Sequence, residues 1–298
     1  MPELPDVIVY VEALNARVVG EPLEAARIAS PFVLRSVDPP LDAAVGRRVA
    51  GVRRLGKRVV LELEGELFLV VHLMIAGRLR WRERGAAIPG KVGLAAFDFP
   101  PGTVLLTEAG SRKQASLHVV SGRARLAEHD RGGLEVLDAS VDEFRDALTR
   151  ENHTVKRALT DPTLLSGIGN AYSDEILHAA RLSPARLTQR LTGEEIARLF
   201  DSTRAVLTRW IDLLRSQAGG SFPEKVTAFH EEMAVHGRFG KPCPACGTPV
   251  QRIVYARNES NYCPRCQTEN RLLSDRSLSR LLREDWPTTI EELERRRG

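Results

Sequence analysis

CPACGTPVQRIVYARNESNYCPRC, residues 243–266, holds all four cysteines of the chain as two C-x2-C pairs with sixteen residues between them. Each pair turns tightly enough for two thiolates to bind one tetrahedral ion, and the intervening length suits a β-hairpin that returns the second pair. A shell of four sulfur ligands is closed, so the metal is structural, and zinc is the expected ion. The sequence therefore predicts one zinc bound by Cys243, Cys246, Cys263 and Cys266.

The composition is that of an ordinary globular protein. Of 298 residues, 43% are hydrophobic and 28% charged, which excludes disorder, collagen and coiled coil as the overall class. There is no apolar run of ~18 residues and no signal-like N-terminus, so we expect a cytoplasmic protein without a membrane partner. A net charge of +4 permits a polyanionic partner without requiring one. The spacing of the cysteines leaves protein and nucleic acid open as partners of the ribbon, and Arg252, Arg257 and Arg265 favour nucleic acid.

The first half of the chain predicts one helix followed by strands. Residues 4–19 have apolar side chains at helical spacing, with Asp6 as N-cap and Gly20 as the stop. Residues 22–127 are rich in valine and leucine, alternate in places and are interrupted by turn signals. This pattern predicts an antiparallel sandwich or barrel.

The second half predicts helices and then the ribbon. From about residue 141 the apolar period lengthens to that of amphipathic helices, after a linker at 128–140. We expect an α+β protein with four parts, at residues 1–128, 129–238, 239–270 and, as a partly helical tail, 271–298.

A glycine turn indicates a phosphate site. In LSGIGN, Gly167 and Gly169 lead into a helix that begins near Asn170. Free N–H groups at a helix start bind phosphate, and glycines let it approach closely. An ordinary helix corner is the alternative.

The N-terminus offers a nucleophile. A small residue after Met1 permits its removal, which would leave Pro2 as a secondary amine with a pKa of roughly 7.7–8.0. Such an amine forms an iminium with a sugar aldehyde, and Glu3 stands beside it as a general acid or base. An ordinary exposed chain end is the alternative here. The basic cluster Arg53-Arg54-Leu-Gly-Lys57-Arg58 could bind phosphates, with a solvated turn as the alternative.

In this order, the motifs resemble the formamidopyrimidine-DNA glycosylase/endonuclease VIII family of base-excision-repair enzymes. The stretches that carry the resemblance are PELPDV at 2–7, LGK at 55–57, HLMIAG at 72–77, GIGNAYSDEILH at 167–178, VHGRFGKPCPACG at 235–247 and YCPRCQ at 262–267. The resemblance implies an N-terminal β-sandwich with flanking helices, a helix-two-turn-helix domain, a zinc ribbon and DNA in the cleft between the domains.

The resemblance also implies roles. Pro2 would attack C1′ of a flipped-out nucleotide and Glu3 would protonate the sugar ring oxygen, while Lys57 and Asn170 would hold phosphates. Strand cleavage by elimination would follow from the iminium.

Departures from the family pattern suggest a divergent subgroup. Asp6 stands where many members have a second glutamate. The positions that fill the void of the flipped base hold Ile75, Arg112 and Lys113, and the ribbon-turn phosphate position holds Asn258, with Arg257 beside it.

We therefore predict a bifunctional DNA glycosylase/AP lyase that acts on damaged duplex DNA as a monomer, with no obligatory protein partner. The lesion and the opposite base stay open, as do single-stranded or crosslinked substrates. A DNA-binding protein with lost or narrowed catalysis and a zinc-ribbon protein-interaction module are the alternatives.

Overall fold

The computed structural model describes residues 1–298 except 111, 225, 228, 256–257, 275–286 and 296–298. The chain forms two compact units: unit 1 is Met1–Arg131 with Thr208–Ala228, and unit 2 is Gly132–Leu207 with Phe229–Gly298. The division passes through helix α6 (Gly193–Ala218), so one helix contributes residues to both. The four-part division at 128, 238 and 270 stays a prediction.

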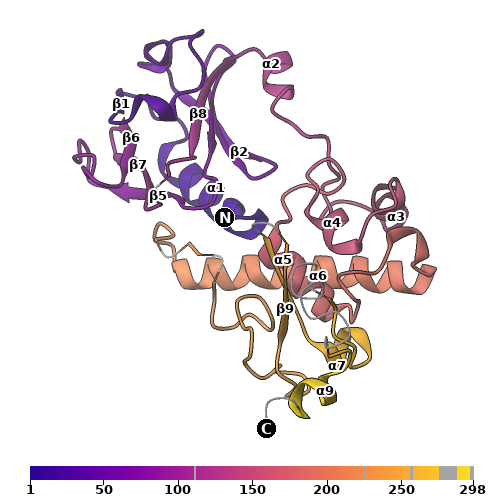
Figure 1. The fold of residues 1–298 in the computed structure, drawn as a ribbon. Coiled ribbons are helices and arrows are strands. Elements are labelled where there is room, and N and C mark those ends of the chain that lie inside the picture. The colour runs from indigo at the N-terminus through magenta and orange to yellow at the C-terminus, as the bar shows by residue number, and fades with distance from the viewer. Residues whose placement is uncertain (111, 225, 228, 256–257, 275–286, 296–298) are drawn as a thin grey trace. The chain divides into compact units, whose positions relative to one another are not determined.

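Unit 1 contains two four-stranded antiparallel sheets (Figure 1). One has the order β2-β3-β4-β8 and the other β1-β6-β7-β5. The predicted antiparallel, β-rich N-terminal region is therefore confirmed. The strands are β1 (Ala25–Ile28), β2 (Val49–Leu55), β3 (Arg58–Leu63), β4 (Leu67–His72), β5 (Gly77–Arg82), β6 (Gly93–Phe99), β7 (Gly102–Glu108) and β8 (Ser116–Ser121).

The core of unit 1 lies between the two sheets. Val59 and Leu61 of β3 share it with Phe97 of β6 and Val104 of β7. The intervening Val60 faces the other side of its sheet, where a smaller cluster packs beneath α2 (Arg123–Ala127). The period of two along β3 thus covers both faces of the sheet with apolar side chains.

Helix α1 (Leu4–Val18) packs on this core through Val7, Tyr10, Leu14 and Val18, as the helical spacing predicts. The predicted N-cap at Asp6 is wrong by one turn. Glu3 is the N-cap, and Asp6 is the third helical residue of a capping box. Oδ2 of Asp6 accepts the backbone N–H of Glu3, so the side chain of Asp6 caps the start of the helix.

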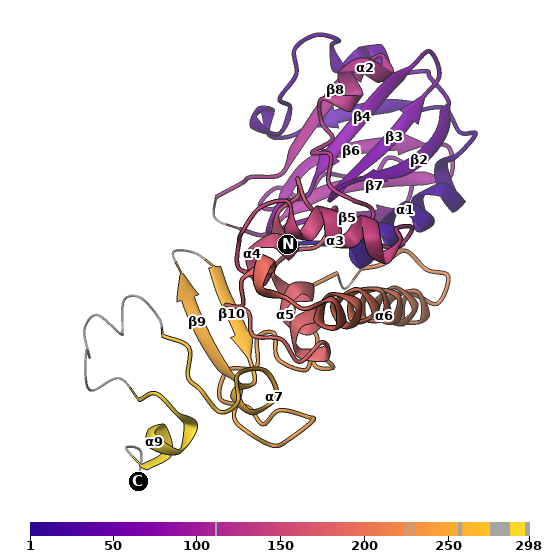
Figure 2. The same ribbon diagram turned by 90° about the vertical axis from the view of Figure 1, so that its right-hand side faces the viewer.

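Unit 2 contains the predicted helices and the ribbon hairpin (Figure 2). Strands β9 (Gln251–Tyr255) and β10 (Asn258–Tyr262) pair antiparallel. No helix in the described part of the chain is long and apolar enough to span a membrane. The helices described in unit 2, besides part of α6, are α3 (Val141–Thr149), α4 (Val155–Thr160), α5 (Asn170–Ala179), α7 (Pro264–Thr268) and, in the tail, α9 (Ile290–Arg295). Unit 2 also has the short 3-10 turn η3 (Thr188–Arg190), and unit 1 has η1 (Pro31–Val33) and η2 (Leu41–Ala44).

Candidate active site and zinc centre

The start of the chain is buried in unit 1. Pro2 is buried, Glu3 is 2% exposed and Asp6 is 1% exposed. The backbone N–H of Glu3 donates to Oδ2 of Asp6 at 2.8 Å, which fixes the first turn of α1. Acidic side chains are almost never fully buried unless they are paired. The burial of both the Glu3 and the Asp6 carboxylates is therefore unusual.

Cationic side chains surround this chain end. The pKa of the terminal amine, which in this chain is that of Met1, lies below its ordinary value, first because burial disfavours the charged form; Arg78 and Lys57 act in the same direction, and the Glu3 and Asp6 carboxylates oppose them. Lys57 lies in the β2–β3 turn, where Gly56 has a φ of +59°. The structure therefore brings Pro2, Glu3 and Lys57 into one region that favours a neutral amine.

Two residues of this region were not predicted from the sequence, Arg78 and Tyr10. Nε of Arg78 donates to the carbonyl oxygen of Val226 at 2.5 Å, and its Nη1 donates to that of Gly77 at 2.7 Å. Tyr10 lies one helical turn after Asp6 and is fully buried. The i, i+4 spacing of Asp6 and Tyr10 is the sequence signal that places them on one face of α1.

The segment after α6 packs against this region of unit 1. The ring of Phe222 lies 5.7 Å from that of Tyr10 and 6.4 Å from that of Trp81, centroid to centroid. Glu224 forms ion pairs with Arg80 and Arg82, each at 2.7 Å. Phe222 and Glu224 therefore hold this segment on β5, beside the strand end that carries Arg78.

The predicted void-filling residues lie on two loops at one end of the β5–β7 pair. Gly77 and Glu108 are register partners there, and Ile75 precedes the first while Lys113 follows the second. Ile75 is 64% exposed. The ammonium group of Lys113 donates to the backbone carbonyl of Glu108, whereas Arg112 is exposed. The structure thus groups Ile75, Arg112 and Lys113 at one sheet end.

In unit 2, the glycine turn leads into α5 as predicted. Gly167 has a φ of +80°, and Gly169 is the extended N-cap. Nδ2 of Asn170 donates to the carbonyl oxygen of Glu259 at 2.7 Å, so the helix start lies against strand β10. Asn258 begins that strand, opposite Tyr255. Arg257 lies outside the described residues.

A buried polar network lies beneath this helix start. Asp174 is fully buried and bonds to Lys156 at 2.5 Å and to Nδ1 of His236 at 2.8 Å, and Ser260 donates to it at 3.1 Å. The neighbouring Glu175 accepts three backbone N–H groups, from residues 234–236, at 2.7–2.9 Å. This network was not predicted from the sequence, where its signal is an acidic pair followed by the apolar Ile176 and Leu177 of α5.

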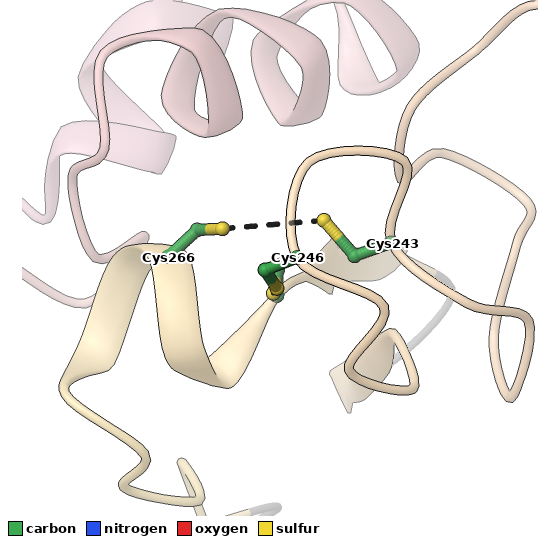
Figure 3. Close-up of side chains that lie close together, drawn as sticks. Cys243, Cys246 and Cys266 are labelled. Carbon is green, nitrogen blue, oxygen red and sulfur yellow. Dashed lines mark hydrogen bonds between the residues drawn. The ribbon is translucent and has the colours of Figure 1, made fainter.

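The four cysteines meet at one point of unit 2. Their sulfur atoms all lie within 4.8 Å of one another, with Cys243 and Cys266 at 4.0 Å and Cys246 and Cys263 at 3.4 Å. Figure 3 shows the sulfurs of Cys243 and Cys266 pointing toward each other. A tetrahedral ion with Zn–S bonds of ~2.3 Å requires sulfurs about 3.8 Å apart.

The chemistry of these sulfurs also fits a cation. Burial, followed by the sulfurs of Cys246 and Cys243, raises the pKa of Cys266 to about 11, although its hydrogen bond with Cys263 opposes this. Burial also favours a higher pKa for Cys246, but hydrogen bonds, chiefly those with Thr248, outweigh burial and lower that pKa to about 6. Such thiols become thiolates together only when a bound metal offsets their mutual repulsion. The four residues therefore form a zinc site, as predicted.

Models of three domains match the chain. The formamidopyrimidine-DNA glycosylase N-terminal domain matches residues 1–117, the formamidopyrimidine-DNA glycosylase H2TH domain matches residues 134–219, and the zinc finger found in FPG and IleRS matches residues 240–268.

Relatives and solved structures that align with about 90% of this chain agree with the three domain matches. A formamidopyrimidine-DNA glycosylase of Heliobacterium modesticaldum is 35% identical over 280 residues, covering 90% of this chain and 100% of the relative. The structure of MutM in complex with carbocyclic 8-oxo-G containing DNA aligns with a TM-score of 0.79 at 26% identity, covering 90% of this chain and 100% of that one. The Lactococcus lactis Fpg with abasic-site DNA aligns at 0.78 and 27%, covering 89% and 99%.

Proposed function

Because the chain belongs to the formamidopyrimidine-DNA glycosylase family, it is a DNA glycosylase with AP-lyase activity, and we propose that its buried N-terminal segment carries out both reactions. In this proposal Met1 is removed and the nitrogen of Pro2 becomes the nucleophile. The observation that carries it is the burial of the Pro2-Glu3 dipeptide beside Lys57 and Arg78. An ordinary chain end is exposed and needs no such surroundings.

The chemistry follows from these groups. The amine of Pro2 attacks C1′ of a damaged nucleotide that has been flipped out of the stack and the C1′–base bond breaks, so the base leaves with that bonding pair and takes up the proton that the amine releases. Glu3 protonates the sugar ring oxygen, so the ring opens and the C1′–nitrogen bond becomes an iminium. The iminium acidifies the C2′ proton, and its loss expels the 3′ phosphate, which cleaves the strand.

The proposed DNA contacts are of two kinds: contacts to phosphates, which position the DNA, and contacts within the base stack, which fill the place of the flipped base. Lys57 and Asn170 bind phosphates that flank the lesion, with the glycine turn at 167–169 beside Asn170. The loops that carry Ile75, Arg112 and Lys113 fill the void of the flipped base, since they lie together and two of these side chains are exposed. Asn258 or Arg257 contributes the hairpin-turn phosphate contact.

The zinc site has a structural part in this proposal. The hairpin between its two cysteine pairs contains Glu259, whose carbonyl oxygen accepts the hydrogen bond from Asn170. Zinc bound there would hold this hairpin, and with it Asn170, in place. We propose that the protein acts on damaged duplex DNA as a monomer.

Borohydride trapping tests the proposal. Protein with a native N-terminus is incubated with duplexes that carry oxidised or ring-opened bases or a preformed abasic site, and base release and the reduced adduct are measured. We expect an adduct that mass spectrometry maps to Pro2. An adduct on a lysine, or equal trapping by protein with an uncleaved N-terminal tag, would overturn the Pro2 assignment. DNA binding without base release or adduct would favour a binding protein on the same scaffold.

A further inference from the structure

One oxygen of the buried Asp6 carboxylate makes no hydrogen bond to any residue that the structure describes. Its Oδ2 accepts the N–H of Glu3 at 2.8 Å, whereas Oδ1 has no partner. The hydroxyl of Tyr10, one turn along α1, is equally buried and also lacks a hydrogen-bond partner there. Burial raises the pKa of Tyr10, with a smaller contribution from the charge of Asp6, whereas Arg78 and the backbone of Leu79 lower it.

Helix capping does not account for Oδ1. A capping box needs one carboxylate oxygen at this position, and Oδ2 supplies it. A buried polar atom without a partner destabilises the folded state, and a catalytic role is one of the reasons for which native proteins retain such an atom. Oδ1 is therefore an acceptor left available beside the chain end.

The groups around Asp6 come from two elements. Helix α1 contributes Tyr10, the residues just before it contribute Glu3 and the Met1 amine, and strand β5 contributes Arg78. Burial, the largest effect, raises the pKa of Asp6 to about 7, and the charge of Glu3 adds to it; the amine, Arg78 and the N–H of Glu3 oppose it. Lys57, from the β2–β3 turn, acts on the amine. The carboxyl thus holds a proton about as strongly as an N-terminal amine does.

We propose that Oδ1 of Asp6 accepts a proton from the Pro2 ammonium and thereby frees the amine for attack, an inference that rests on the proposed role of Pro2. One proton moves from nitrogen to Oδ1, and no other bond changes in this step. At an abasic site the freed amine then adds to the C1′ aldehyde. The hydroxyl of the carbinolamine leaves as water when the proton held by Asp6 returns to it, which leaves the iminium and an ionised Asp6.

The two groups titrate together. When a carboxyl and an amine have pKa values within about one unit, a share on the order of 10% of the singly protonated pair has the proton on the carboxyl. That share does not change with pH while the pair holds one proton. Below about pH 7 the pair takes up a second proton, and above the pKa of the amine it holds none. An amine without such an acceptor loses about tenfold in its neutral fraction for each pH unit below its pKa.

Single-turnover trapping on preformed abasic-site DNA between pH 5.5 and 9 tests the inference. For the native protein we expect a bell-shaped profile with its maximum between about pH 7 and 8, since the reactive pair holds one proton, takes up a second below about pH 7 and loses the last above about pH 8. For Asp6→Asn, which keeps an oxygen for the Glu3 N–H, we expect a rate that rises with pH and levels off above about pH 8.5, because only the neutral fraction of the amine then limits it. Asp6→Glu restores a carboxylate and the bell-shaped profile. The matched control is Asp142→Asn, in the first turn of α3, whose side chain is 73% exposed and whose profile stays native.

The outcomes separate the two proposals. A native pH profile in Asp6→Asn overturns the proton transfer and leaves the Pro2 nucleophile standing. An equal loss at every pH, not restored by Asp6→Glu, assigns Asp6 to helix capping alone and also overturns it. No trapping by the native protein overturns the Pro2 assignment and this inference with it. If Asp6→Asn does not fold, the native profile decides, since a native rate that levels off above pH 8.5 without falling contradicts the inference.

Discussion

The ammonium group of Lys156, on α4, lies 2.5 Å from Oδ1 of Asp174, which is fully buried on α5. The same ammonium donates to the carbonyl oxygen of Asn170 at 2.8 Å, in the first turn of α5. One cation therefore ties two helices together and also holds the backbone of the residue that we assign to a DNA phosphate.

Replacing Lys156 is expected to destabilise unit 2 strongly. Lys156→Met leaves Asp174 with less charge compensation inside the protein, and breaking a buried pair in this way costs about 3–5 kcal/mol. Urea unfolding measures the loss. Arg145→Met is the control, because Arg145 forms an exposed i, i+3 pair with Asp142 that contributes less than about 0.5 kcal/mol. Equal effects of the two variants would contradict a stabilising role for the buried pair.

Acid is expected to weaken the same network. Burial alone would raise the pKa of Asp174, but Lys156 and His236 outweigh burial and hold that pKa below its ordinary value. A carboxyl with a lowered pKa in the folded state stabilises the fold above its unfolded pKa, and this stability is lost as pH falls through the folded value. We expect the free energy of unfolding to fall below about pH 4, and less so in Asp174→Asn. Asp146→Asn, on the exposed side of α3, should retain the native pH dependence.

Local sequence patterns predicted the helices, the strands and the zinc ligands. Contacts between residues that lie far apart in the sequence could not be predicted from such patterns. The C-x2-C spacing fixed the zinc ligands because two tight turns leave few ways to place four sulfurs. The helical period along α1 placed Val7 and Leu14 in the core. Asp174 was not predicted, because its partners Lys156 and His236 come from α4 and from the segment before the ribbon. Arg78 was missed for the same reason, since its contact with Val226 spans 148 residues of sequence.

One zinc per chain is expected from elemental analysis, and its removal should weaken DNA binding. Without the ion, four crowded sulfurs no longer hold the β9–β10 hairpin, and the hairpin contains the carbonyl oxygen that binds Asn170. A chelator should lower the melting temperature and DNA affinity together, and added zinc should restore both. Cys246→Ser should behave as the chelated protein does. A metal-free protein that folds and binds DNA normally would exclude a structural zinc.

Lys57 is expected to act through a phosphate. Lys57→Ala should weaken binding to damaged and undamaged DNA alike and flatten the slope of log K against log salt by about 0.9, the contribution of one phosphate contact. Binding isotherms between 50 and 300 mM salt measure the slope. Lys91→Ala removes an exposed lysine from the β5–β6 connection and should leave the slope unchanged. A Lys57 variant with altered lesion preference and the native slope would contradict the phosphate assignment.

Glu3→Gln is expected to separate base excision from strand cleavage. Glutamine keeps the shape and one acceptor oxygen of Glu3 but cannot donate the proton that opens the sugar ring, so excision should fall by about 100-fold or more. At a preformed abasic site the aldehyde form is already open, so the Pro2 amine can add without that proton, and trapping should be retained in part. Single-turnover assays on a damaged-base duplex and on the matching abasic duplex give the two rates. Glu12→Gln, on the exposed side of the same helix, should leave both rates native, since Glu12 pairs with Arg215 on the surface. An equal fall of both rates in Glu3→Gln would show that the ring-opening role is wrong. Glu3 would then serve a step common to the two reactions, such as deprotonation of the Pro2 amine or packing of the chain end.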